Sequence, residues 1–258
     1  MVQSPIIRAA SLAFLGSVAL FSAALAAETT DVLVEKARKL DRALDAAPAL
    51  DLYRQAEAQD PKRVDVLVGA ARQYRHLMAD ATSSSEKLRL LGLAQSYSQR
   101  AVQIDPESAE AHLSLAITYA KRFALEGRKQ QVTTSRLLRS ELDNTLRLAP
   151  KSDLAWYLLG RWCEGYAELS PTRRTMGEML YGPLPKATYE EAIRCFQKSI
   201  ALNPNRLMNY IELGRIYGLM GRTEEARTLL KKGLAMPNRE KDDPDSKKRG
   251  NEALATLH

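Results

Sequence analysis

Residues 207–237 read LMNYIELGRIYGLMGRTEEARTLLKKGLAMP, and this stretch decides the fold. Apolar residues recur at helical spacing from Tyr210 to Tyr217, and a second amphipathic run follows Gly221. A glycine between two helical runs predicts a turn, and Pro237 cannot continue the second helix. The stretch therefore predicts two helices that fold back on each other as a hairpin.

Small and large residues alternate along both expected helices. Gly214 follows Leu213 in the first helix, and Ala226, Leu230 and Gly233 follow in the second. Two helices approach closely where a small side chain faces a large one, so Gly214 and Ala226 should mark the contact. The order aromatic, Leu-Gly, Tyr, small, large apolar and proline resembles the tetratricopeptide repeat, which implies stacked helical hairpins.

The ending of this unit returns along the chain. Similar helix ends precede Pro106, Pro150 and Pro204, with a fainter version before Pro61. Together with Pro237 these prolines are separated by 45, 44, 54 and 33 residues. A plain repeat has about 34 residues, so we expect longer helices in the first units and an insertion in the third.

The sequence therefore predicts an all-α fold. We expect a right-handed superhelix of stacked tetratricopeptide-type hairpins with elongated helices and one inserted helix, in one domain at 30–257. The expected hairpins lie at about 31–60, 63–105, 109–149, 153–203 and 206–236, with a capping helix at 245–257. The charged residues Asp242–Arg249 are expected to be solvated.

The third unit carries the insertion, residues 170–187. Ser170 and Pro171 are typical of a helix N-cap and first turn. Tyr181–Pro185 contains a glycine and two prolines and predicts a loop. Thr188-Tyr-Glu-Glu191 is a capping-box pattern that starts the next helix.

Residues 1–26 predict a targeting segment. Arg8 precedes a mostly apolar run from Ala9 to Leu25, and Ala24-Leu-Ala26 is a small-x-small cleavage pattern. We expect a signal peptide cleaved after Ala26 and export, to a bacterial periplasm. The alternative is an uncleaved N-terminal membrane anchor, since the run approaches the length that spans a bilayer.

The chain is basic, with 38 Lys and Arg against 31 Asp and Glu. The formal charge is +7, or +6 without the leader, which holds one arginine and no acid. The cations concentrate in residues 121–139 and continue into the third unit. The candidate partner-binding residues are Arg122, Arg128, Arg136, Arg139, Arg161, Trp162, Tyr166, Arg173 and Arg174. On one concave wall they would form a basic groove for an acidic peptide or a lipid head group. Alternatively, they are solvated helix faces without a partner.

The sequence contains no pattern typical of a catalytic or metal site. His76, His112 and His258 do not lie at metal-ligand spacing from one another or from a cysteine. We therefore expect no metal, no cofactor and no enzymatic activity. Sparse aromatics and the lack of a nucleic-acid motif argue against nucleic acid as a partner. Cys163 and Cys195 are either a disulfide that export would permit or two small core residues.

The third unit carries more than a generic repeat. In order, it contains Leu159-Gly-Arg-Trp-Cys163, Ala167-Glu-Leu-Ser170, Arg173-Arg174, Leu180-Tyr-Gly-Pro-Leu-Pro185 and Thr188-Tyr-Glu-Glu-Ala192. This order resembles the regulator-of-microtubule-dynamics family over roughly residues 60–257. The resemblance implies a repeat domain that binds partners, with microtubules among them for eukaryotic members. The chain departs at Glu141, where the family has a histidine. An exported chain would meet no tubulin, so we expect the fold to transfer and microtubule binding not to.

Two functions remain as hypotheses. The first is a non-enzymatic scaffold that holds an acidic or extended protein segment by its arginines, with Trp162 and Tyr166 giving apolar contact. The second is a carrier of an anionic hydrophobic ligand such as a phospholipid. In that case the insertion would cover an apolar cleft lined from residues 160–190, and Arg173 or Arg174 would meet the head group.

Overall fold

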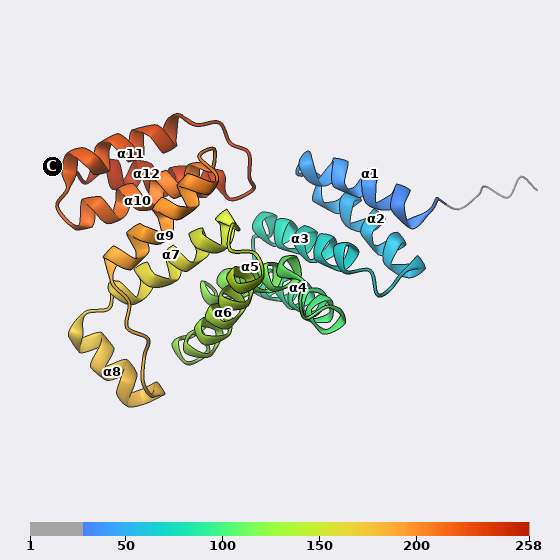
Figure 1. The fold of residues 1–258 in the computed structure, drawn as a ribbon, viewed down its shortest axis with the longest axis horizontal. Helices are drawn as coiled ribbons and strands as arrows, with labels where there is room; N and C mark the ends of the chain where they lie inside the picture. Colours follow the sequence, from blue (N-terminus) through green and yellow to red (C-terminus); the bar gives the residue numbers. More distant parts are fainter. Residues whose placement is uncertain (1–27, 258) are drawn as a thin grey trace, which may run out of the picture.

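Twelve α-helices and no strand make up the part of the chain that the computed structural model describes, residues 28–257 (Figure 1). The helices are α1 (Thr30–Arg42), α2 (Ala46–Gln59), α3 (Val64–Asp80), α4 (Ser84–Ile104), α5 (Ala109–Phe123), α6 (Arg128–Leu148), α7 (Asp153–Ala167), α8 (Pro171–Tyr181), α9 (Tyr189–Leu202), α10 (Leu207–Leu219), α11 (Thr223–Ala235) and α12 (Asp243–Ala255). The expected leader and its cleavage after Ala26 lie outside the described residues, as does His258.

The helices pair as consecutive hairpins. α1 packs on α2, α3 on α4, α5 on α6, α7 on α9 and α10 on α11. The second helix of each pair also contacts the first helix of the next, so the hairpins form one curved stack (Figure 1). α8 stands apart between α7 and α9, and α12 covers α10 and α11. The predicted fold class, a stack of helical hairpins with one inserted helix, is confirmed.

Side-chain caps begin several helices at the points that the sequence predicts. Ser170 accepts a hydrogen bond from the Arg173 amide, with Pro171 in the first turn. Thr188 and Glu191 form the full capping box that starts α9. Each such cap satisfies otherwise unpaired backbone donors and contributes about 1 kcal/mol. The insertion is therefore bounded by local signals at both ends.

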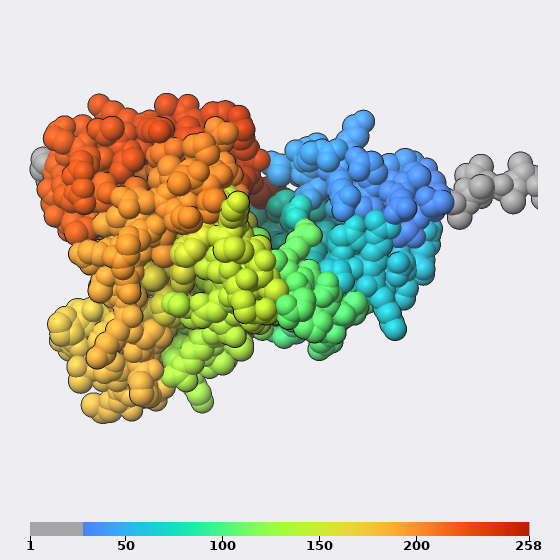
Figure 2. Space-filling model, viewed as in Figure 1, coloured from blue at the N-terminus to red at the C-terminus, as the bar shows by residue number. Residues whose placement is uncertain are grey.

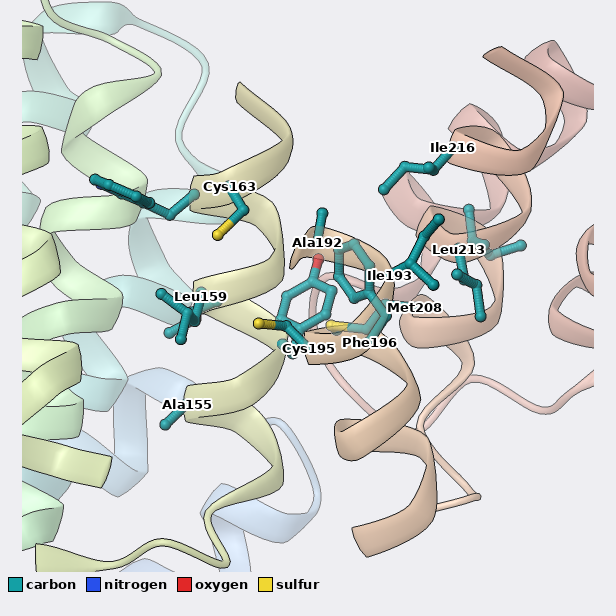
Figure 3. Close-up of a cluster of buried hydrophobic side chains, with 14 of the residues drawn as sticks. Ala155, Leu159, Cys163, Ala192, Ile193, Cys195, Phe196, Met208, Leu213 and Ile216 are labelled. Carbon is teal, nitrogen blue, oxygen red and sulfur yellow. The ribbon is translucent and has the colours of Figure 1, made fainter. Parts of the chain in front are cut away.

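The hairpins close where small residues meet large ones. A Cβ added to Gly214 would lie 2.9 Å from Leu230 Cγ and 3.2 Å from the Ala226 carbonyl oxygen. A Cβ added to Gly160 would lie 2.9 Å from the Phe196 ring. Phe196 is fully buried among the side chains that join α7, α9 and α10 (Figure 3). The predicted contact at Gly214 is confirmed, and a direct equivalent occurs one unit earlier.

The segment before α12 differs from its prediction. The charge pattern predicts that Asp242–Arg249 is solvated, but α12 begins at Asp243, which is only 3% exposed. The Asp243 carboxylate accepts hydrogen bonds from the backbone N–H groups of Arg239 and Glu240. Arg249 reaches the buried Glu212 carboxylate at 2.8 Å. The prediction holds for Asp245 and Lys248, which are exposed, but it was wrong for Asp243 and Arg249. Asp243 is buried by its bonds to nearby backbone amides, and Arg249 is drawn to a buried carboxylate on α10, which spacing along the chain does not reveal.

The same segment crosses the face formed by the first helices of the hairpins. Lys121 on α5 pairs with Asp242 at 2.8 Å, and Lys241 pairs with Asp80 at the end of α3 at 2.7 Å. Glu240 pairs with Arg206 at the start of α10. Part of the wall on which the sequence predicted a groove is therefore covered by the chain's own acidic segment.

Candidate partner-binding cleft

A cleft of about 570 Å³ opens between α6, α7 and α9. Its apolar lining comes mainly from α7, and its charged lining from α6, α9 and the loop before α9. The lining residues are Arg139, Trp156, Leu159, Trp162, Cys163, Lys186, Ala187, Glu191, Arg194, Cys195 and Lys198. Four cations and one acid therefore surround a floor that includes two tryptophans.

The cleft exists because α6 packs on α7 less extensively than α2 packs on α3 or α4 on α5. The insertion then places Lys186 and Ala187 at the cleft. Arg136 donates to the carbonyls of Tyr181 and Pro183, each at 3.3 Å, and so ties α6 to the inserted loop. The long third unit thus contributes residues of its insertion to the lining of the cleft.

Arg174 fixes the other side of the insertion. Its guanidinium donates to the carbonyl of Pro185 at 2.9 Å and to that of Tyr166 at 3.1 Å. It also lies 3.7 Å from Glu178, one turn further along α8. Arg136 and Arg174, both predicted to hold a partner, therefore hold the inserted segment in this structure.

Arg139 and Trp162 form one wall of the cleft. The Arg139 guanidinium lies 4.9 Å from the Trp162 ring centroid, a cation–π distance, and pairs with Asp143 at 2.9 Å. Trp162 is 8% exposed and donates its indole N–H to Ser135 Oγ at 2.9 Å. The Tyr166 ring lies 4.7 Å from Trp162, and its hydroxyl contacts the same serine at 2.8 Å. These contacts hold the arginine against the cleft floor.

The two cysteines lie on facing helices and line this cleft (Figure 3). Both are free and buried, Cys163 on α7 and Cys195 on α9. The neighbouring Cys163 thiol and burial raise the pKa of Cys195, so that sulfur is protonated at neutral pH. The structure thus agrees with small core residues rather than with a formed disulfide.

Arg161 lies in a different environment, a buried ionic cluster between α7 and α10. It pairs with Glu212, which is fully buried and also contacts Arg215 and Arg249. Burial opposes ionisation of Glu212, but the three guanidinium groups outweigh it and lower its pKa. Burial raises the pKa of the neighbouring Glu164 to about 7. Arg161 therefore contributes to a junction between repeats.

The nine predicted residues do not gather on one surface. Arg139 and Trp162 line the cleft, while Arg122 pairs with Glu126 at 2.9 Å. Arg128 is exposed at the start of α6, and Arg173 is exposed on α8. Trp156, Arg194 and Lys198 also line the cleft and are not among the nine predicted residues. The i,i+4 spacing of the last two was the available signal, since it places both on one face of α9.

A neighbouring cleft shows that the basic rim is not general to the stack. A hollow of about 450 Å³ lies one unit further on, between α9, α10 and α11. Its charged lining residues are Glu224 and Glu225, beside Leu213 and Tyr217. Positive charge is thus a local property of the cleft at α6, α7 and α9.

The stacked hairpins define the class: a helical-repeat protein of the tetratricopeptide type. The fold is similar to that of a thermophilic tetratricopeptide-repeat protein from Thermus thermophilus, with a TM-score of 0.62 and 18% identity. The similarity covers 88% of this chain and 100% of that one. Within this class, the chain belongs to the family of regulator of microtubule dynamics proteins 1–3, whose model matches residues 27–258.

Curated relatives carry the same family name. The chain is 26% identical over 229 residues to mouse regulator of microtubule dynamics protein 2, covering 88% of this chain and 56% of that protein. It is 28% identical over 193 residues to mouse protein 1, covering 74% of this chain and 63% of the relative. The chain thus spans little more than half the length of these relatives.

Residues 28–257 contain neither a cluster of metal-binding side chains nor a candidate membrane-spanning helix. Among these residues, no group of three or more His, Cys, Asp or Glu side chains is placed to hold a metal ion. None of the helices described is long and apolar enough to cross a membrane.

Proposed function

We propose that this chain is a non-enzymatic interaction scaffold that binds an acidic, extended protein segment in the cleft between α6, α7 and α9. The observation that supports this most is the cleft lining, where cations surround an apolar floor with Trp156 and Trp162. Aromatic residues and arginine dominate the binding energy of many protein interfaces. Complementary charge adds specificity and speeds association.

The cations of the cleft are available to a partner. Lys186, Arg194 and Lys198 form no ion pair with another side chain of residues 28–257. Arg139 pairs with Asp143, but both side chains are 40% or more exposed, so this pair is weak and exchangeable. The one acid, Glu191, accepts the Thr188 amide in its capping box. A carboxylate-bearing segment would therefore meet unpaired positive charge.

A phospholipid or another anionic amphiphile is the second candidate ligand. The apolar floor beside a cationic rim favours such a molecule, and the cleft volume of about 570 Å³ falls within the usual range for small-ligand sites. In this alternative Arg139 and Lys186 would meet the head group, and the floor at Leu159 would contact the hydrocarbon. Arg173 is exposed on α8, so the cleft cations replace it as the head-group contacts in this proposal.

Only the names of the relatives connect this chain with microtubules. Those names concern proteins of which this chain covers little more than half. We propose that the shared property is partner binding by the repeat domain. We further propose that residues 1–26 direct export, and an exported chain would find its partner outside the cytoplasm.

Charge reversal on one face of α9 tests the scaffold. The probe is a fluorescein-labelled peptide of alternating glutamate and leucine, measured by anisotropy at low salt. Arg194→Glu with Lys198→Glu should weaken binding about tenfold or more, and salt should weaken wild-type binding. The matched control is Lys231→Glu with Lys248→Glu, two exposed cations outside the cleft. Equal binding by both double variants would exclude this cleft as the site.

Native mass spectrometry separates the two ligand classes. The chain would be purified gently after expression and measured without added ligand. A lipid-sized adduct that Arg139→Glu removes would favour the carrier. Adduct-free protein that binds the acidic peptide would favour the scaffold.

A further inference from the structure

The inserted helix α8 presents an apolar ridge to solvent. Met176, Met179 and Leu180 are 56%, 79% and 63% exposed. Their i, i+3 and i+4 spacing places them on one helix face. No residue of α8 is buried. Exposed apolar side chains that gather in this way mark an interaction surface rather than ordinary scatter.

The opposite face of α8 packs on the loop that follows it and contacts the end of α7 through the Tyr166 carbonyl. Arg174 donates to two carbonyl groups outside the helix, and a Cβ at Gly177 would lie 2.8 Å from Leu184 Cδ1. Residues 174 and 177 share the inner face, and a turn of 100° per residue places Met176 and Met179 on the outer one. α8 projects from the stack (Figures 1 and 2), so a surface can approach it from outside the stack.

The charge around the ridge favours an anionic surface. Residues 170–187 carry Arg173, Arg174 and Lys186 against Glu178, a net charge of +2. Glu178 lies 3.7 Å from Arg174 on the inner side. Arg173 is exposed one turn before Met176 and has no carboxylate partner within residues 28–257. The ridge therefore combines apolar tips with unpaired positive charge.

We propose that α8 docks the chain on an anionic lipid surface. Met176, Met179 and Leu180 would enter the boundary between head groups and acyl chains, and Arg173 would meet anionic head groups. A second copy of the chain fits less well, because ridge-to-ridge contact would bring like charges together. A protein groove fits less well because the ridge is convex and isolated. This surface is distinct from the cleft and does not depend on what the cleft binds.

Vesicle flotation tests the docking. The chain would begin at Ala27, the expected product of leader cleavage, because all twelve described helices and their core lie after it. The probe is phosphatidylcholine vesicles with about one third phosphatidylglycerol, compared with phosphatidylcholine alone. Met176→Ser with Met179→Ser and Leu180→Ser should weaken binding to the anionic vesicles about tenfold. Leu219→Ser with Met220→Ser removes exposed apolar side chains elsewhere and should leave binding unchanged.

A fluorescent label on α8 reports contact with the vesicle directly, so this test does not depend on how the triple serine variant folds. An NBD label on Met179→Cys should shift to the blue and brighten on anionic vesicles, while a label on Leu219→Cys should not. Cys163 and Cys195 are free and line the cleft, so both labelled variants would be made with Cys163→Ala and Cys195→Ala. Arg173→Glu should weaken binding only to the anionic vesicles.

Wild-type-like flotation of the triple serine variant, or an unchanged fluorescence spectrum of the label at position 179, would overturn the proposal. A concentration-dependent dimer in sedimentation that the triple variant abolishes would assign the ridge to a second copy instead.

Discussion

Lys121 Nζ lies 2.8 Å from both carboxylate oxygens of Asp242, a residue 121 positions later in the chain. The contact joins α5, in the middle of the stack, to the segment that precedes α12. Lys241 and Asp80 form a second link from the same segment to the end of α3. Together these pairs tie the last hairpin back to earlier ones, which contacts between neighbouring repeats cannot do.

Exchanging the charges of Lys121 and Asp242 should show how much this ion pair contributes to stability. Asp242→Lys places like charges together and should free the segment at 238–242, while adding Lys121→Glu should restore part of the contact. Asp242 is 46% exposed, so we expect a loss of only about 1 kcal/mol in the free energy of unfolding. Amide exchange of residues 238–242 is the more sensitive measurement. No recovery in the double variant would show that the pair is incidental.

Replacing the buried Glu212 should lower the free energy of unfolding far more. Glu212→Gln would leave Arg161, Arg215 and Arg249 around a neutral side chain, and removing one partner of a buried ionic group costs about 3–5 kcal/mol. Urea unfolding measures the loss. Arg147→Gln breaks a pair whose side chains are 55% and 71% exposed and serves as the control, with an expected effect of about 0–1 kcal/mol. Similar losses in both variants would contradict the role of burial.

His76 should make the protein sensitive to acid. Burial, with Arg75, Arg72 and Lys121 nearby, lowers the pKa of His76 from 6.5 to about 4, although Asp41 acts in the opposite direction. The folded chain therefore binds fewer protons than the unfolded chain between these pH values, so stability falls as pH falls from about 6.5 to about 4. The loss attributable to His76 is at most about 3 kcal/mol. His76→Asn should flatten the wild-type curve in this window, and parallel curves would contradict the assignment.

Two glycines of α7 should respond oppositely to the same substitution. Gly160→Ala places a methyl group 2.9 Å from the Phe196 ring and should destabilise by about 1–3 kcal/mol. Gly165→Ala meets nothing within 4 Å and should stabilise the helix by about 0.5–1 kcal/mol. Thermal and urea unfolding of the two variants would measure these changes in stability. Helix propensity changes equally in both variants, so the difference between them reports the packing at each glycine. Equal shifts would mean that close packing at Gly160 adds nothing.

Part of the site could be predicted from sequence and part could not. Arg139 and Trp162 were predicted as partner-binding residues and line the cleft. Arg161 belongs to the same charged pattern, yet its side chain pairs with Glu212, some fifty residues later. A helix sequence shows which residues share a face, but not which helix that face meets. The cleft itself depends on how loosely α6 packs on α7, which no local pattern encodes.

The sequence by itself determined the hairpins, because periodicity, caps and helix-ending prolines act within a few residues. The Thr188–Glu191 capping box is a signal of this kind. Gly214 meets Leu230 across the hairpin that such local signals form. Only the tertiary structure decided the partners of the long charged side chains and the position of the open cleft. Such side chains reach across helices, and their pairing depends on helix crossing and burial, which make an unpaired buried charge too costly to leave. The segment at Asp242 shows the result, since a residue expected only in solvent contacts α5 in the middle of the stack.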